Sequence, residues 1–208
     1  MEEKKISEQE SLELITQMIN QTKKDLSVGN GDSFLMWGYL SASISLAVIV
    51  MLLATNDPRC AWFYMAIPIA GFTASGIKTY KAKRKSHVAS TYASNTINNV
   101  WAIISAVFAV YAISCLLHFG EVRSWNGMFL LGMLLPGIGT YTTGVILKEK
   151  SIQMCGLLGV VIGTGLLRDY VCGEQVISIR QMGQMVLSFV ITLIIPGHIL
   201  NFKAKKQQ

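Results

Sequence analysis

Six stretches of the sequence contain no charged residue, and each is long enough to cross a membrane as a helix. The hydrocarbon core of a bilayer is about 30 Å thick, so a spanning helix needs about 20 apolar residues, with roughly 17 as the lower limit. The six stretches are Ser33–Asn56, Cys60–Ile77, Ser86–Gly120, Ser124–Leu147, Ser151–Leu167 and Gln181–Phe202. They predict an all-α, polytopic membrane helix bundle.

These stretches also predict how the chain is divided. We expect spans at about 34–55, 61–78, 97–119, 125–147, 151–167 and 181–202, which together form a transmembrane domain over residues 33–202. Residues 1–32 are expected to form a cytoplasmic amphipathic helix and a turn, and residues 203–208 a basic cytoplasmic tail. Because six spans use most of the 208 residues, we expect no second folded domain.

Positive charge lies almost entirely on one side of the predicted spans. If the N-terminus is inside, fourteen of the 18 lysine and arginine residues lie in inner segments, including every lysine. The four in the outer loops are Arg59, Arg123, Arg168 and Arg180. The positive-inside rule therefore predicts that both termini are cytoplasmic. The net charge of +6 is best explained by attraction to anionic headgroups at the inner face, so we expect no direct binding of nucleic acid.

The segment before the first span has the pattern of an amphipathic helix. Ser7 and Glu10 have the spacing of a capping box, which satisfies the first backbone N–H groups of a helix. The apolar residues that follow at helical spacing are Leu12, Ile15, Met18 and Ile19. Residues 29–31, Gly-Asn-Gly, are expected to end this helix. We expect it to rest in the inner interface or against the bundle, and the alternative is a docking site for a cytoplasmic partner.

Each span that runs from outside to inside contains a proline, at Pro68, Pro136 and Pro196. This repetition predicts three pseudo-repeated helical hairpins in one orientation. A proline within a helix frees a carbonyl about one turn earlier, and in lipid that carbonyl needs a partner in a neighbouring helix or a water molecule. The three expected kinks either surround a common cavity open to the cytoplasm or only shape the bundle, and the second reading is preferred.

Glycines are frequent in the fourth and fifth spans. Gly159 and Gly163 have the GxxxG spacing that lets two membrane helices approach closely. We therefore expect Gly159 and Gly163 at a contact between helices, and the fourth and fifth spans at the centre of the bundle.

A small set of polar residues within the spans is the candidate polar cavity: His198, Asn98, Asn99 and Thr140. Asn98 and Asn99 enter the membrane beside the lysine-rich inner loop, where a polar pocket or an anionic headgroup could sit. The preferred alternative is hydrogen bonding between helices. His198 is expected to bind a carbonyl freed near Pro196 or to reach the inner interface.

Motifs of catalytic and metal-binding chemistry are missing from the sequence. There is no Walker loop, HExxH, CxxC or GxSxG motif, and no charged residue lies deep in a span. We therefore expect no catalytic residue, metal or cofactor, and the chain is not expected to be an enzyme. The spacing of the cysteines fits no metal site, while Cys60 and Cys172 in outer loops either form a disulfide or remain unpaired.

Four segments give the chain its resemblance to a known family. They are Trp37-Gly38-Tyr39, residues 136–140 (Pro-Gly-Ile-Gly-Thr), residues 195–198 (Ile-Pro-Gly-His) and the opening Ser-Glu-x-Glu-Ser-Leu-x-Leu-Ile segment from Ser7 to Ile15. The chain resembles small multi-span inner-membrane proteins of Bacteroides-type bacteria over nearly its whole length. The resemblance implies a bacterial inner-membrane location and a neighbouring gene for a small winged-helix transcriptional regulator. It carries over no binding or catalytic residue.

Two functional hypotheses follow. The first is a non-enzymatic sensor or regulatory membrane protein that responds to the membrane or a small apolar ligand and acts through its N-terminal helix. The second is a small facilitator or exporter built from three hairpins. The expected partners are the bilayer, anionic headgroups at the inner face, a cytoplasmic regulator protein and further copies of the chain in a homo-oligomer.

We predict six spans with both termini cytoplasmic. In a background without the native cysteines, single cysteines at Ser27 and Lys205 should resist an impermeant thiol reagent in intact cells, because inner segments are shielded by the membrane. A cysteine at Gly173 should react. Labelling of the Lys205 position from outside would contradict the topology.

Overall fold

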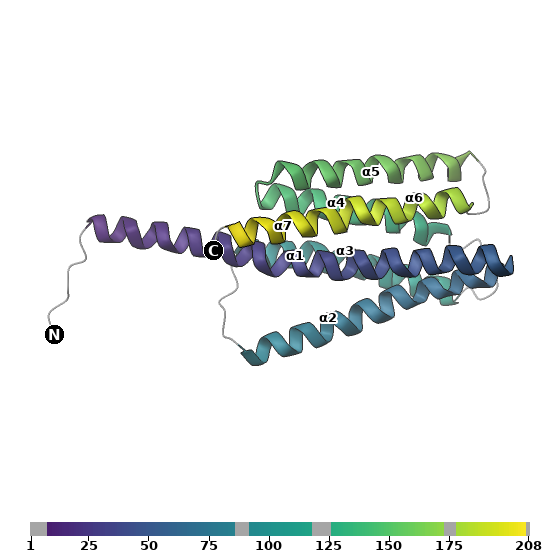
Figure 1. The fold of residues 1–208 in the computed structure, drawn as a ribbon, viewed down its shortest axis with the longest axis horizontal. Coiled ribbons are helices and arrows are strands. Elements are labelled where there is room, and N and C mark those ends of the chain that lie inside the picture. Colours follow the sequence, from purple (N-terminus) through teal and green to yellow (C-terminus); the bar gives the residue numbers. More distant parts are fainter. Residues whose placement is uncertain (1–7, 86–91, 118–125, 173–177, 207–208) are drawn as a thin grey trace.

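The computed structural model describes residues 8–85, 92–117, 126–172 and 178–206, and within these ranges the chain is helical and contains no strand (Figure 1). The elements are α1 (Glu8–Thr55), η1 (Pro58–Met65), α2 (Ala66–Lys85), α3 (Tyr92–Leu117), α4 (Asn126–Ile146), α5 (Lys150–Val171), α6 (Ile179–Phe189), η3 (Val190–Ile194) and α7 (Ile195–Lys206). Among the described residues the predicted all-helical architecture is confirmed, with six helices long and apolar enough to cross a membrane. These spans are Gly31–Thr55, Arg59–Lys81, Tyr92–Leu117, Gly127–Ile146, Lys150–Arg168 and Ile179–Lys206.

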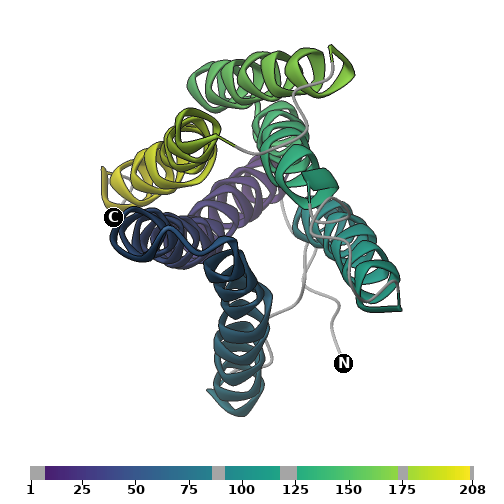
Figure 2. The ribbon, with the colours of Figure 1, turned by 90° about the vertical axis from the view of Figure 1, so that its right-hand side faces the viewer.

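The helices form a bundle (Figures 1 and 2). Helix α4 packs on α5, α3 and α6, and α1 packs along α6, η3 and α7. Helix α5 lies at an edge and exposes Met154, Leu157 and Val161, so the expected central place of the fifth span is wrong. Helix α2 packs on α1 and η1 and leans away from the other helices toward its C-terminus.

The first helix is continuous from Glu8 to Thr55, so the turn expected at residues 29–31 is wrong. Gly31 is buried, and a Cβ atom there would collide with Asn201 and lie 3.1 Å from the carbonyl oxygen of Gly197. This glycine therefore allows α7 to approach α1 closely and does not break the helix. The N-terminal part of α1 projects beyond the bundle (Figure 1).

Each of the three prolines lies within one of the long apolar helices, as expected, but their local positions differ. Pro68 is the third residue of α2 and follows directly after the 3-10 helix η1. Pro136 lies inside α4. Pro196 is the second residue of α7 and follows the π-helical turn η3.

The carbonyl freed by Pro196 has a partner on another helix. The N–H of Ile195 binds the carbonyl of Val190 in the π-helical turn, and Pro196 has no N–H to give to the carbonyls that follow, those of Ile191 (π register) and Thr192 (α register). The hydroxyl of Thr140 on α4 donates to the carbonyl oxygen of Thr192 at 2.7 Å, and both threonines are fully buried. A buried acceptor left unpaired costs roughly 1–3 kcal/mol, so this bond fixes α4 against η3.

Glycines bring α4 and α5 into backbone contact. A Cβ atom at Gly137 would lie 2.8 Å from the backbone nitrogen of Val160, and one at Gly144 would lie 2.6 Å from that of Gln153. On α5, Gly163 lies against Leu134 and Gly159 lies against Thr192, and a Cβ atom at Gly159 would lie 3.3 Å from the Cα atom of Gly137. Close approach increases van der Waals contact, which drives helix association in lipid.

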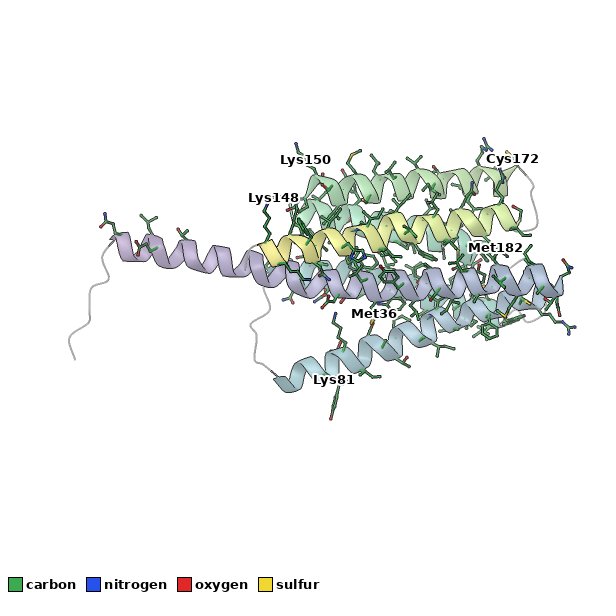
Figure 3. All side chains as sticks on the ribbon, viewed as in Figure 1. Met36, Lys81, Lys148, Lys150, Cys172 and Met182 are labelled. Atoms are coloured by element: carbon green, nitrogen blue, oxygen red, sulfur yellow. The ribbon has the colours of Figure 1, made fainter. Side chains whose placement is uncertain are left out.

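One end of the bundle, here called the lysine end, carries Lys81, Lys148 and Lys150, while Cys172 lies at the opposite end (Figure 3). At the lysine end Lys203 forms an ion pair with Glu149. The Asn201 side chain also donates to Asp32 at 2.8 Å, which joins α7 to α1. The helices are therefore tied together at this end by polar contacts as well as by packing.

We predict that Gly159→Leu destabilises the protein by about 1–3 kcal/mol or more, because the new side chain must displace Thr192, whose carbonyl and hydroxyl are both hydrogen-bonded. The matched control is Gly165→Leu on the same helix, since no atom lies within 4 Å of a Cβ there. Thermal unfolding in detergent measures both. Equal midpoints for the two variants would place Gly159 at a lipid-facing position.

Candidate functional site

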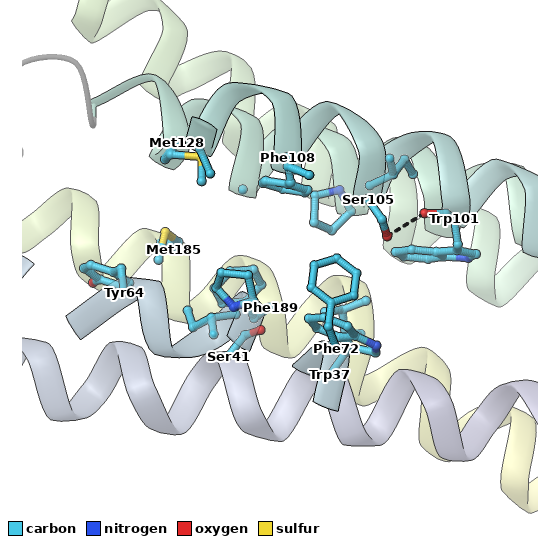
Figure 4. A pocket seen from close by; sticks show the side chains of 18 of the residues that line it. Trp37, Ser41, Tyr64, Phe72, Trp101, Ser105, Phe108, Met128, Met185 and Phe189 are labelled. Carbon is cyan, nitrogen blue, oxygen red and sulfur yellow. Dashed lines mark hydrogen bonds between the residues drawn. The ribbon is translucent and has the colours of Figure 1, made fainter. Parts of the chain in front are cut away.

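A cavity of about 300 Å³ lies between α1, η1, α2, α3, α4, α6 and η3 (Figure 4). Its wall is largely apolar, and among the described residues that line it none is charged. The aromatic residues in the wall are Phe34, Trp37, Tyr64, Phe72, Trp101, Phe108, Phe129 and Phe189. A mostly apolar, aromatic cavity with a few polar groups is typical of a site for a small or elongated apolar ligand.

Edge-to-face aromatic pairs hold the helices together around this cavity. Phe34 on α1 meets Trp101 on α3 with ring centroids 5.2 Å apart. Trp37 on α1 meets Phe72 on α2 at 5.6 Å, and Tyr64 of η1 meets Phe129 of α4 at 4.8 Å. Such pairs contribute about 0.5–1.5 kcal/mol each beyond the area they bury. The cavity is therefore framed by specific contacts between helices.

The cavity is long and lies between two helices that diverge. Its lining on α3 extends from Ile97 to Ala112, which is roughly 20 Å at about 1.5 Å of rise per residue. Helix α3 packs on α4, whereas α2 packs on α1 and η1 and leans away (Figure 2). Phe72 of α2, which lines the cavity, is 46% exposed. The site thus opens sideways, toward the region that lipid would occupy.

Most polar groups in the middle of the cavity wall are already hydrogen-bonded. The Ser105 hydroxyl donates to the carbonyl oxygen of Trp101 at 2.8 Å (Figure 4). The indole N–H of Trp101 donates to the Thr143 hydroxyl at 3.2 Å, on the side of α4. Both groups are therefore satisfied within the protein, and the wall presents mainly rings and methylene groups.

Three hydroxyl groups in and behind the wall are exceptions. Within the part of the chain that the structure describes, the buried hydroxyls of Ser45, Tyr64 and Ser188 have no hydrogen-bond partner. The Tyr64 hydroxyl lies near that of Ser45, but the two do not meet the geometry of a hydrogen bond. Of the three, Tyr64 lines the cavity, beside Met185 at the end opposite Trp37 and Trp101 (Figure 4).

The lysine end of the cavity is more polar. Ser33 on α1 and Asn98 on α3 both line it. The ammonium group of Lys78 on α2 donates to the Ser33 hydroxyl at 3.0 Å. One cation is therefore held beside the mouth of an otherwise uncharged cavity.

The structure does not gather the candidate polar residues into one site. Asn98 and Asn99 are both exposed, and of the two only Asn98 lines the cavity. Thr140 is buried, and its hydroxyl donates a hydrogen bond to the carbonyl oxygen of Thr192. His198 is exposed, and its Nε2 atom lies 2.8 Å from the Tyr39 hydroxyl, so its partner is a side chain of α1 and not a carbonyl near Pro196.

The prolines and cysteines are also dispersed. Pro68 and Pro136 line the cavity, but Pro196 does not. Cys60 and Cys172 are free thiols, and Cys60 lies 3.3 Å from the Thr55 hydroxyl. Helices α2 and α6, whose proximity a disulfide between these cysteines would need, are not packed on each other. Of the two alternatives left open by the sequence, the structure has the unpaired one.

Sequence reasoning missed the aromatic wall, although a signal was present. Cavity residues on α3 recur at helical spacing at Trp101, Ser105, Phe108 and Ala112, and those on α1 at Phe34, Trp37 and Ser41. In a membrane helix such a pattern is easily hidden, because the lipid-facing side is apolar as well. The paired tryptophans and phenylalanines of α1 and α3 were the available clue.

The described residues contain no group of three or more His, Cys, Asp or Glu that could hold a metal ion. The chain matches no protein-family model, no curated protein and no solved structure.

Proposed function

We propose that the chain is a non-enzymatic membrane sensor. Its cavity binds an apolar group from the bilayer, and α1 transmits the effect of this binding to a cytoplasmic partner. The observation that carries this proposal is the continuity of α1. The same helix lines the cavity with Phe34, Trp37 and Ser41 and continues without a break to Glu8. A change at the cavity wall can therefore tilt or shift the projecting segment.

The projecting segment is suited to a partner by its sequence pattern. Leu12 is 64% exposed, while the side chains of Ile15, Met18 and Ile19 and the cap at Ser7 lie outside the described residues. An apolar stripe on a helix that is too polar to span must be covered by headgroups, by the bundle or by another protein. We infer that a cytoplasmic regulator covers it, because the family resemblance implies a neighbouring gene for such a regulator.

The proposed setting is the bacterial inner membrane, with both termini in the cytoplasm and the lysine end at the inner face. This orientation follows from the positive-inside rule and from the placement of Lys81, Lys148 and Lys150 at one end of the bundle (Figure 3). The three successive hairpins α1–α2, α3–α4 and α5–α7 are consistent with a pseudo-repeat, and exposed apolar faces such as that of α5 would allow a homo-oligomer.

The second candidate function is a facilitator or exporter of an apolar or small solute. It is favoured by the length of the cavity, which follows α3 for much of its span. A facilitator must expose the site to both sides in turn, and the flux it produces does not depend on a cytoplasmic partner. Solute flux into vesicles containing the pure chain is therefore the observation that would select this function.

We predict that Ile15→Glu combined with Met18→Glu abolishes co-purification of the cytoplasmic partner from native membranes. The two charges would fall on the apolar stripe, where a partner would have to desolvate them. The protein should still insert, because α1 from Gly31 to Thr55 is unchanged. Quantitative mass spectrometry of proteins retained by the tagged full chain measures the result.

The matched control is Gln17→Glu combined with Gln21→Glu, which adds the same charge to the polar side of the same helix. The control should retain the partner. Loss of the partner from both variants, or from neither, would contradict the proposal. If the stripe variant fails to accumulate, the segment packs on the bundle itself and the signalling role is wrong.

A further inference from the structure

The cavity differs in chemistry along its length. Its wall is aromatic and uncharged from Trp101 to Met128, and it becomes polar at Ser33 and Asn98. Lys78 is fixed beside this polar mouth by its bond to Ser33. A long apolar cavity with a cation at one end is complementary to an amphiphile that has an anionic headgroup.

We propose that the cavity binds one acyl chain of an anionic phospholipid, with the phosphate of its headgroup at Lys78, Ser33 and Asn98. This inference deepens the proposed sensor function, on which it rests, by naming the class of ligand. The bound lipid would come from the leaflet at the lysine end.

The dimensions of the cavity fit an acyl chain. One leaflet contributes about half of a hydrocarbon core that is about 30 Å thick, and the cavity follows α3 for roughly 20 Å from Ile97 to Ala112. A chain that starts at headgroup level would therefore lie along the wall between Trp101 and Phe108. The cavity volume of about 300 Å³ is at the lower limit for ligand sites, which suits one chain and not a whole lipid.

The lysine end supplies a phosphate site at the correct depth. Ser33 lies near the start of the first span and Lys78 near the end of the second, so both are at the level of the headgroups. An ammonium group has three N–H donors, and one of those on Lys78 goes to Ser33. The others can point to a phosphate oxygen, and a hydrogen bond to a charged group contributes more than one between neutral groups.

The divergence of α2 from α3 explains how a lipid could reach the site. Helix α2 is held to the bundle through α1 and η1, by the edge-to-face contact of Trp37 with Phe72 and by the packing of Trp37 on Gly71. No comparable packing joins α2 to α3 in the described residues, so the cavity opens between them. The second acyl chain of the lipid would remain outside, in the bilayer.

The test is native mass spectrometry of the full chain, purified in a mild detergent and offered an equimolar mixture of phosphatidylglycerol and phosphatidylcholine with matched chains. The wild type should retain one phosphatidylglycerol per chain in clear preference to phosphatidylcholine. Lys78→Gln should weaken this retention about tenfold, since it removes a charge-assisted contact. Lys78→Arg keeps the charge and should retain the lipid.

Lys150→Gln is the control, because it removes the same charge from the same end of the bundle on α5, across the molecule from α2 (Figure 3). It should bind lipid as the wild type does, and excess soluble glycerol phosphate should not compete. Equal loss in the two glutamine variants would show only general attraction of anionic lipid to the lysine end and would overturn the site. Equal retention of the two lipids would overturn the phosphate assignment. The sensor function is tested separately, by co-purification of the cytoplasmic partner.

Discussion

Thr140 donates its hydroxyl hydrogen to the carbonyl oxygen of Thr192, and the arrangement of the bundle depends on this bond. The bilayer core offers no water, so the carbonyl freed by Pro196 needs a donor from a neighbouring helix. Thr140 can supply it because Gly137 and Gly159 bring α4, α5 and η3 into close contact. The half of the molecule that contains α4, α5 and η3 is closely packed. Helices α2 and α3 are joined to it mainly through aromatic side chains, which leaves the cavity between them.

The long helix α1 connects the two halves and links the cavity to the projecting segment. It packs along α6, η3 and α7 on one side, and on another its Trp37 and Phe34 meet α2 and α3. A chain inserted between α2 and α3 would change the surroundings of Phe34 and Trp37 first. Because α1 is unbroken as far as Glu8, this change would reach the segment on which we propose that a regulator docks.

The fold could be predicted from the sequence because spans are defined by length and charge, two properties that are read directly. The requirement that a proline-freed carbonyl find a donor was also predictable, but the donor was not, since Thr140 and Thr192 meet only in three dimensions. The prediction that the helix ends at residues 29–31 was wrong, because Gly31 allows close packing of α7 on α1. The cavity was missed because aromatic residues facing a site and those facing lipid look alike in sequence.

The central claim, that the cavity holds an acyl chain, is tested most directly by quenching tryptophan fluorescence with brominated chains. Trp62→Phe and Trp125→Phe would leave Trp37 and Trp101, which both line the cavity, as the reporters. Ser105→Phe should fill the cavity, whereas Ala106→Phe adds the same ring to an exposed position on the same helix. We expect quenching that saturates near one brominated phosphatidylglycerol per chain, retained with Ala106→Phe and lost with Ser105→Phe. Quenching that rises only in proportion to the brominated lipid fraction, and equally in both variants, would contradict the account.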